Sequence, residues 1–245
     1  MHIYLSLRTC GGLEIQQHYN HIIQGVIYDS IDHELATFLH EKGYENENRK
    51  FKLFTFSRLL GRFQLNREKS TIRFIDNLQL MISSPVDYFC QSIANGMLTR
   101  SNICLGNGNT EVEKMMVQQF KVEKEKIIVR TLSPIVVYST LLRPDGRKYT
   151  CYFQPGEPDY DFLIENNLRK KYKAFYGQKA PAGEVKVKKL GRIKLNVVYY
   201  KNTVIKGYSG KLELTGPKEL LQMAVDAGLG NKNSQGFGCV ELLSR

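Results

Sequence analysis

A glycine-rich segment near the C-terminus is the most specific chemical signal in the sequence. It reads GLGNKNSQGFG from Gly228 to Gly238 and lies between a predicted helix and a predicted strand. Glycines let a backbone approach a ligand closely, and exposed N–H groups in such a loop can hold phosphate oxygens. The spacing matches neither a Walker A loop nor a dinucleotide fingerprint. Composition alone favours a phosphate-binding loop and a tight structural turn equally.

Histidine is the side chain best suited to proton transfer near neutral pH. His33 and His40 are seven residues apart, so both can lie on one face of a predicted helix that begins at His33. His18 and His21 form an H-x-x-H pair. Neither an H-E-x-x-H pattern nor a C-x-x-C cysteine pair accompanies them, so we predict no bound metal and no cofactor. The odd number of cysteines also argues against a disulfide framework.

The positive charge of the chain is concentrated in one window. Between Arg169 and Lys211 there are thirteen basic residues and one acidic residue, so this window has a net charge of +12. The whole chain has a net charge of +11, and the rest of the chain therefore sums to −1. Aromatic residues are interleaved with the basic ones, and such a mixture can neutralise phosphates and stack on exposed bases. The alternation in Val185-Lys186-Val187-Lys188 predicts a strand with one buried face and one basic face. A solvated basic surface is the alternative interpretation.

The elements that must position these groups follow an α+β order. Predicted strands cover 2–7, 51–60, 71–75, 79–83, 103–120, 126–137, 148–153, 185–200, 211–215 and 237–243, and predicted helices cover 20–31, 33–42, 85–99, 159–176 and 217–227. Residues 44–50 are polar and are predicted to form a loop, and Pro144-Asp145-Gly146 is predicted to form a turn between strands. Each half approximates β-α-β-β-α-β, which predicts two tandem ferredoxin-like domains with antiparallel sheets, 1–122 and 123–245. Helices on one face of such a sheet leave the other face free to bind a ligand.

Short motifs run from the first predicted helix to the last predicted strand in a distinctive order. They are YNHIIQGVIY at 19–28, FLHE at 38–41, KLFTFS at 52–57, LSPI at 132–135, and the G-h-G-x5-G-h-G spacing of Gly228, Gly230, Gly236 and Gly238. Taken together, they resemble the CRISPR-associated repeat-processing endoribonuclease family over most of the chain. The resemblance implies two ferredoxin-like domains and an enzyme that cuts the repeats of a long CRISPR transcript to release guide RNAs.

The resemblance also implies metal-independent cleavage, in which a ribose 2′-OH attacks the adjacent phosphate and leaves a 2′,3′-cyclic phosphate and a 5′-OH. By position, it assigns the catalytic roles to Tyr28, His40 and Lys52 in the first domain. We expect His40 to protonate the leaving 5′-oxygen and Lys52 to stabilise the transition state. An unperturbed phenol is only about 0.1% ionised at pH 7, so Tyr28 is expected to be a hydrogen-bond donor. The identity of the base stays open between Tyr28, should Lys52 lower the pKa of the phenol, and His40. Lys42 or Lys50 could replace Lys52, because the polar insert lengthens the span after His40.

RNA contacts are predicted along the basic strand and the glycine-rich loop of the second domain. The candidate residues are Lys186, Lys188, Lys189, Arg192, Lys194, Gly228, Gly230, Lys232, Asn233, Ser234, Gly236 and Gly238. The expected partner is CRISPR repeat RNA, with other subunits of a guide-RNA complex or a second copy of the chain as further partners. A non-catalytic RNA-binding subunit of such a complex is the alternative function. A DNA-binding or nucleotide-binding module fits the charge but explains neither motif.

The apolar runs and the N-terminal segment indicate the cellular location that we expect for the protein. No apolar run approaches the roughly 20 residues of a membrane-spanning helix. The first twelve residues, MHIYLSLRTCGG, have no basic start followed by an apolar core. We therefore expect a cytoplasmic protein without a membrane partner.

Overall fold

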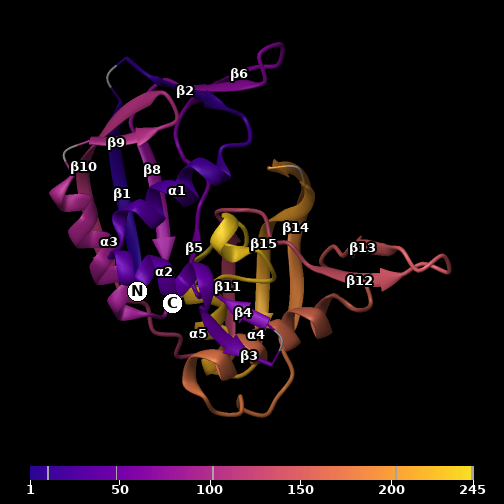
Figure 1. The fold of residues 1–245 in the computed structure, drawn as a ribbon. Coiled ribbons are helices and arrows are strands. Elements are labelled where there is room, and N and C mark those ends of the chain that lie inside the picture. The colour runs from indigo at the N-terminus through magenta and orange to yellow at the C-terminus, as the bar shows by residue number, and fades with distance from the viewer. Residues whose placement is uncertain (10, 48, 101, 202, 244–245) are drawn as a thin grey trace.

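Two large antiparallel sheets with helices packed on them form the body of the described chain (Figure 1). One three-stranded and two two-stranded sheets accompany them. The computed structural model describes residues 1–9, 11–47, 49–100, 102–201 and 203–243. Its first half contains β1 (His2–Thr9), β2 (Leu13–Gln16), α1 (Asn20–Ser30), α2 (His33–Glu41), β3 (Tyr44–Asn46), β4 (Arg49–Phe51), β5 (Thr55–Phe56), β6 (Phe63–Asn66), β7 (Thr71–Phe74), β8 (Leu78–Ser83), α3 (Asp87–Thr99), β9 (Asn102–Leu105) and β10 (Gly108–Gln118). Its second half contains β11 (Lys126–Thr131), β12 (Tyr138–Leu142), β13 (Lys148–Tyr152), α4 (Tyr160–Tyr176), β14 (Lys186–Tyr200), β15 (Thr203–Thr215), α5 (Lys218–Ala227), a short 3-10 turn (Asn233–Gln235) and β16 (Val240–Leu242).

The first sheet has the strand order β5-β8-β1-β10-β9, with β1 in the centre. Alternate residues of β1, Ile3, Leu5 and Leu7, are buried, because successive side chains of a strand point to opposite faces. They join one core with buried residues of the helices, such as Ile27 of α1 and Ile93 of α3. The helices therefore cover one face of this sheet.

The second sheet has the order β14-β15-β11-β16 and its own core. Val129 of β11 and Leu212 of β15 pack there with Ile164 and Leu168 of α4. In both sheets the four principal strands lie in the order second, third, first, fourth of a β-α-β-β-α-β unit. The predicted α+β class with antiparallel ferredoxin-like sheets is thus confirmed, while the domain boundaries at 122 and 123 stay a prediction.

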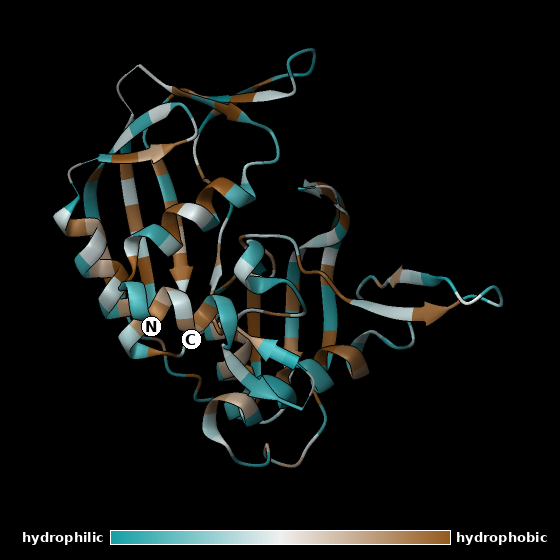
Figure 2. Cartoon of the chain, viewed as in Figure 1, coloured by the Kyte–Doolittle hydropathy of each residue, from teal (hydrophilic) through white to brown (hydrophobic). Residues whose placement is uncertain are grey.

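Several segments differ from the expected elements. Residues 13–16 and 63–66, for which no strand was expected, form β2 and β6, and β15 begins at Thr203, ahead of the expected strand at 211–215. Residues 44–50, predicted as a loop, contain the β3–β4 hairpin, whose strands are hydrophilic in Figure 2. The strand expected over 51–60 is interrupted after Phe51, because Leu53 adopts a left-handed backbone (φ 53°) that a ladder cannot continue. The Pro144–Gly146 turn joins β13 to β12, a strand over residues that were not predicted to form one, and this hairpin projects from the body in Figure 1.

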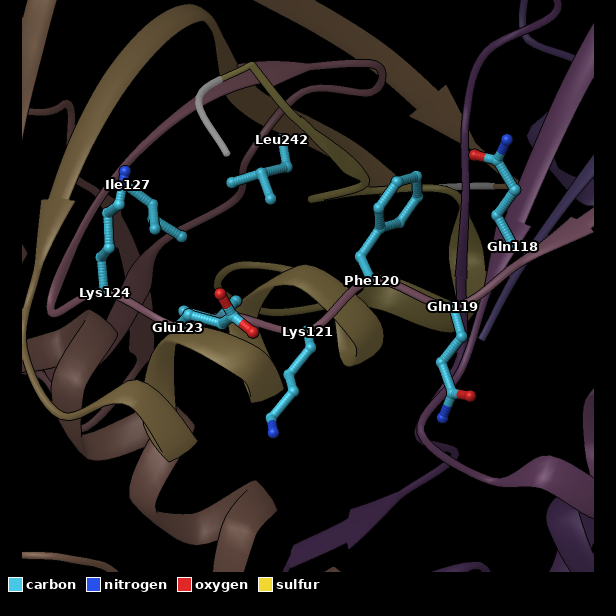
Figure 3. A pocket seen from close by; sticks show the side chains of 9 residues that line it. Gln118, Gln119, Phe120, Lys121, Glu123, Lys124, Ile127 and Leu242 are labelled. Atoms are coloured by element: carbon cyan, nitrogen blue, oxygen red, sulfur yellow. The ribbon is translucent and has the colours of Figure 1, made fainter.

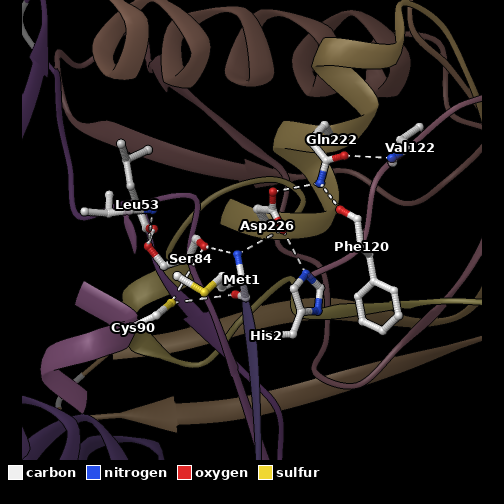
Figure 4. A network of polar contacts seen from close by, with 10 residues as sticks. Met1, His2, Leu53, Ser84, Cys90, Phe120, Val122, Gln222 and Asp226 are labelled. Carbon is white, nitrogen blue, oxygen red and sulfur yellow. Dashed lines mark hydrogen bonds and ion pairs between the residues drawn. The ribbon is translucent and has the colours of Figure 1, made fainter. Parts of the chain in front are cut away.

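A connector of residues 118–124 joins the two halves and borders a cavity of about 410 Å³. Figure 3 shows Phe120 of the connector on one side of this cavity and Ile127 and Leu242 of the second sheet on the other. A buried polar network ties the halves together nearby (Figure 4). His2 Nε2 lies 2.9 Å from Asp226 Oδ1, and Gln222 Nε2 donates to Asp226 Oδ2 at 2.8 Å. Since His2 belongs to β1 and Asp226 to α5, this network fixes how the two sheets meet.

Within the described part of the chain, no helix is long and apolar enough to cross a membrane.

Candidate active site

An open cleft of about 690 Å³ lies where α1 and α2 of the first half meet the glycine-rich segment of the second. Figure 1 shows α1 and α2 beside the yellow C-terminal segment. The cleft brings together all three predicted catalytic residues with cationic side chains of the second half. It is lined by His21, Gln24, Gly25, Tyr28, His40, Lys52, Tyr200, Lys201, Thr203, Ile205, Lys232, Ser234 and Gln235. Every charged residue of this lining is basic.

One face of α1 forms a wall of the cleft. His21, Gln24, Gly25 and Tyr28 follow the i, i+3, i+4, i+7 spacing of a helix face, while Ile23 and Ile27 are buried on the opposite side. Gln24 is held in place from two sides. Its Nε2 donates to Ser234 O at 2.7 Å, and its Oε1 accepts a hydrogen bond from Tyr200 OH.

His40 and Lys52 meet at the C-terminal end of α2. Lys52 Nζ donates to the backbone oxygen of His40 at 3.0 Å, and Lys50 Nζ donates to the backbone oxygen of Glu41 at 2.9 Å. The last carbonyls of a helix lack partners within the helix and attract cations, so both lysines satisfy the end of α2. The left-handed Leu53 places its own side chain in the core of the second half. Lys52, the residue before it, faces the cleft, and the interposed hairpin therefore does not separate Lys52 from His40.

Burial shifts the pKa of two of these groups in opposite directions. Burial raises the pKa of Tyr28 to about 12, with a further contribution from the neighbouring Tyr200 hydroxyl. Partial burial and the nearby Lys50 ammonium lower the pKa of Lys52. Both shifts disfavour the charged form, because removing a group from water penalises its ionised state.

The glycine-rich segment is packed against both halves and not spread on the surface. Gly228, Gly230, Gly236 and Gly238 are all buried with positive φ angles. A Cβ at Gly236 would lie 2.5 Å from the ring of Phe56, and one at Gly238 would lie 1.9 Å from Leu229 O. The structure therefore explains these glycines by close packing. Direct RNA contact at the four positions stays a prediction.

Hydrogen bonds to the loop come from both halves. From the first half, Asn20 Nδ2 donates to Gln235 O at 2.8 Å and Thr55 Oγ1 donates to Phe237 O at 2.9 Å. Within the loop, the Asn233 amide donates to Leu229 O and Phe237 O, so this predicted RNA-binding side chain is engaged internally. Lys232 and Ser234 remain at the cleft.

Lys171, a buried lysine that is not among the residues predicted from the sequence, donates hydrogen bonds to the glycine-rich segment. Lys171 of α4 is 2% exposed, and its Nζ donates to Gly228 O at 2.6 Å and to Gly230 O at 3.0 Å. Complete burial lowers the pKa of Lys171 to about 7. Its spacing from the apolar Ile164 and Leu168 was the available signal, because positions i, i+4 and i+7 share one helix face.

The predicted RNA-binding residues of β14 lie apart from the cleft. Lys186, Lys188, Lys189, Arg192 and Lys194 are all exposed and do not line it. The same strand nevertheless leads to the cleft, because it ends at Tyr200 and is followed by Lys201. A second pocket of about 280 Å³ adjoins the cleft and shares Lys52, Lys232 and Ser234 with it. The charged residues lining that pocket are all basic, namely Arg49, Lys50, Lys52, Lys171 and Lys232.

The remaining histidines occupy different settings. His18 accepts a long hydrogen bond from the Tyr199 backbone N–H at 3.4 Å and packs against the Tyr199 ring. His33 is exposed at the first residue of α2 and does not line the cleft. His21 does line it, although the H-x-x-H spacing with His18 indicates only a possible metal ligand. Among the residues that the structure describes, no three His, Cys, Asp or Glu side chains are grouped to hold a metal ion.

Known proteins share both the sequence and the fold of this chain. The model of the CRISPR-associated protein Cas6 N-terminal region matches residues 14–116, and that of the Cas6 C-terminal region matches 115–242. CRISPR-associated endoribonuclease Cas6 1 of Methanocaldococcus jannaschii is 30% identical over 242 residues, covering 98% of this chain and 92% of the relative. CRISPR-associated endoribonuclease Cas6 of Pyrococcus furiosus is 30% identical over 243 residues, covering 91% and 83%. A solved structure titled CRISPR associated protein Cas6 aligns with a TM-score of 0.81 at 28% identity over 100% of this chain and 99% of its own.

Proposed function

This chain belongs to the Cas6 family of CRISPR-associated endoribonucleases, and on that premise we propose that it cuts CRISPR repeat RNA without a metal ion. The proposed reaction is an attack of a ribose 2′-oxygen on the adjacent phosphorus. The bond from phosphorus to the 5′-oxygen breaks, and the products are a 2′,3′-cyclic phosphate and a 5′-OH. One observation carries the proposal: Tyr28, His40 and Lys52 line a single cleft whose charged residues are all basic.

His40 is the proposed general acid. Its side chain is exposed at the cleft, and its place in the last turn of α2 is held by the hydrogen bond from Lys52 to its backbone oxygen. An imidazolium there donates a proton to the departing 5′-oxygen, so that no alkoxide has to leave.

Lys52, with Lys201 and Lys232, supplies positive charge toward the phosphate. Charge that is fixed in place before the reaction stabilises the pentavalent transition state more effectively than water does. Lys50 is the alternative cation, because it bonds the neighbouring carbonyl of the same helix end.

Tyr28 is proposed to donate a hydrogen bond to the substrate. With a pKa of about 12, only on the order of 10⁻⁵ of the phenol is ionised at pH 7. This fraction supports a neutral hydroxyl that orients the phosphate or the 2′-OH, and it argues against Tyr28 as the base.

The test is cleavage of the repeat RNA encoded beside the gene, in EDTA, with and without a 2′-deoxy substitution at the cut. We expect cutting in EDTA, no cutting of the deoxy substrate, and a loss of about 10²–10⁴-fold in rate for His40→Ala. His33→Ala, on the same helix but outside the cleft lining, is the matched control and should cut at the normal rate. Cutting that survives the deoxy substitution would refute the mechanism.

The same assay separates the alternative function. Retention of intact repeat RNA on a gel, without product, would identify a non-catalytic RNA-binding subunit of a guide-RNA complex. Association with other subunits or with a second copy of the chain stays a prediction.

A further inference from the structure

The proposed reaction needs a group that accepts the proton of the 2′-OH. Of the side chains lining the cleft, none is a carboxylate, and the titratable ones are His21, Tyr28, His40, Lys52, Tyr200, Lys201 and Lys232. The lysines carry protons that would have to be lost first. Burial raises the pKa of both Tyr28 and Tyr200, which keeps these two phenols neutral. Two imidazoles remain, His21 on α1 and His40 on α2. If His40 donates the proton to the leaving oxygen, the second imidazole is the group left to remove one.

The position of His21 suits this role. It lies two helical turns before Tyr28 on the same face of α1, so it reaches the cleft from a different element than His40. Its side chain is exposed, and within the described residues it makes no hydrogen bond or ion pair. His18, its neighbour on the chain, is engaged with Tyr199 instead. Gly25 stands between His21 and Tyr28 with no atom within 4 Å of the place for a Cβ, so the cleft is open at this point, where the scissile phosphate would lie.

We propose that His21 is the general base of the cleavage reaction, acting from α1 while His40 acts from α2. This inference rests on the proposed function. The neutral imidazole of His21 takes the 2′-OH proton as the 2′-oxygen bonds to phosphorus. The phosphorus–5′-oxygen bond then breaks, and the leaving oxygen takes the proton of the His40 imidazolium. His21 ends the reaction protonated and His40 ends it neutral. Proton exchange with water then restores both to their starting states.

A substrate with sulfur in place of the 5′-oxygen at the cut separates the two roles, because a thiolate leaves without being protonated. We would measure single-turnover rates of His21→Ala and His40→Ala on the oxygen and sulfur substrates. On the oxygen substrate each variant should lose about 10²–10⁴-fold. On the sulfur substrate His40→Ala should recover to within about tenfold of the unmodified protein, whereas His21→Ala should keep its full loss.

Rescue by added imidazole is a second measurement. It distinguishes a general base from a residue with a purely structural role, whose loss imidazole would not repair. Added imidazole should restore part of the His21→Ala rate, because a free imidazole can enter the space vacated by the side chain. Affinity for the 2′-deoxy repeat, measured by filter binding, should match that of the unmodified protein. His33→Ala is the control and should behave normally in every assay.

Either of two results would overturn the assignment. One is a His21→Ala variant that cuts the oxygen substrate at the normal rate. The other is recovery of His21→Ala, and not of His40→Ala, on the sulfur substrate, which would reverse the roles. Failure of the proposed function itself would look different, since the unmodified protein would then not cut, or would cut the 2′-deoxy RNA.

Discussion

Replacing Gly25 with alanine should make the protein more stable and less active at the same time. Glycine in the interior of a helix costs roughly 0.5–1 kcal/mol relative to alanine, because it loses more backbone freedom on folding. Gly25 lies in the middle of α1, and a Cβ there would meet no atom within 4 Å. The substitution therefore gains helix stability without a clash, and the sequence retains a destabilising residue at a position that faces the cleft.

The expected gain is about 1 kcal/mol, which for a chain of this length corresponds to a Tm higher by ~2–4 °C. The added methyl group would stand between His21 and Tyr28, where the scissile phosphate is proposed to lie. A displacement of about 1 Å from the reacting geometry can cost on the order of 10²-fold in rate. We therefore expect Gly25→Ala to cut repeat RNA at least about tenfold more slowly, measured in single turnover beside a thermal unfolding curve.

The matched control is the same change on α3. A Cβ at Gly96 would lie 1.8 Å from Ser30 O, at the close approach of α3 to the end of α1. Gly96→Ala should therefore lower the Tm, since one of the helices must move. If Gly25→Ala were stabilised and cut at the normal rate, this face of α1 would not border the reacting phosphate. If it were destabilised, the interpretation of Gly25 as a functional constraint would be wrong.

Three further predictions concern the surroundings of the cleft. The pKa of Lys171 is about 7 in the folded protein, against an ordinary value of 10.5. Between these two pH values the folded protein therefore binds fewer protons than the unfolded chain. The free energy of unfolding should consequently rise from pH 7 to 9 by up to ~1.4 kcal/mol per pH unit. Lys171→Met should flatten that rise in denaturant titrations, and an unchanged slope would contradict the burial argument. Asp226→Ala removes the buried partner of His2 and should cost about 1–3 kcal/mol by chemical denaturation, with the cleavage rate of the folded protein unaltered. Lys188→Ala and Arg192→Ala should each lower the slope of log affinity for RNA against log salt by about 0.7, and a slope that does not move would exclude phosphate contacts there.

The order of the principal strands and helices of both halves could be predicted from the sequence. Tyr28, His40 and Lys52, which the resemblance selects, line one cleft, while their catalytic roles stay a prediction. The strand alternation in β1 and the motifs around Tyr28 and His40 are local signals. The structure agrees with them, because the burial of side chains follows the strand period of two and the helix period of 3.6 residues. The β3–β4 hairpin could not be predicted in this way. Its strands are short and polar, and they are held by contacts with α4 such as Asn46 Nδ2 to Lys170 O at 3.3 Å.

The roles of the loop glycines and of Lys171 depend on partners that are distant along the chain. A positive φ can be expected of a glycine, but not that Phe56 and Asn20 would fill the space beside Gly236. Likewise, the helical spacing of Lys171 indicates a buried helix face, but it does not predict that the backbone oxygens of Gly228 and Gly230 accept its hydrogen bonds. His21 was missed because its partner His18 suggested a metal pair, and only the three-dimensional arrangement separates the two.

The glycine-rich segment is bonded to residues from both ends of the chain, and this sharing has a consequence for how the protein can be divided. Asn20 and Thr55 reach it from one side, and Lys171 reaches it from the other. A chain severed in the connector would give one fragment that carries the imidazoles and another that carries Lys201 and Lys232. The carbonyls of Gln235 and Phe237 in the second fragment would lose the donors that the first fragment supplies. Neither fragment would retain all the residues that line the cleft, so the two halves have to fold together for the proposed reaction.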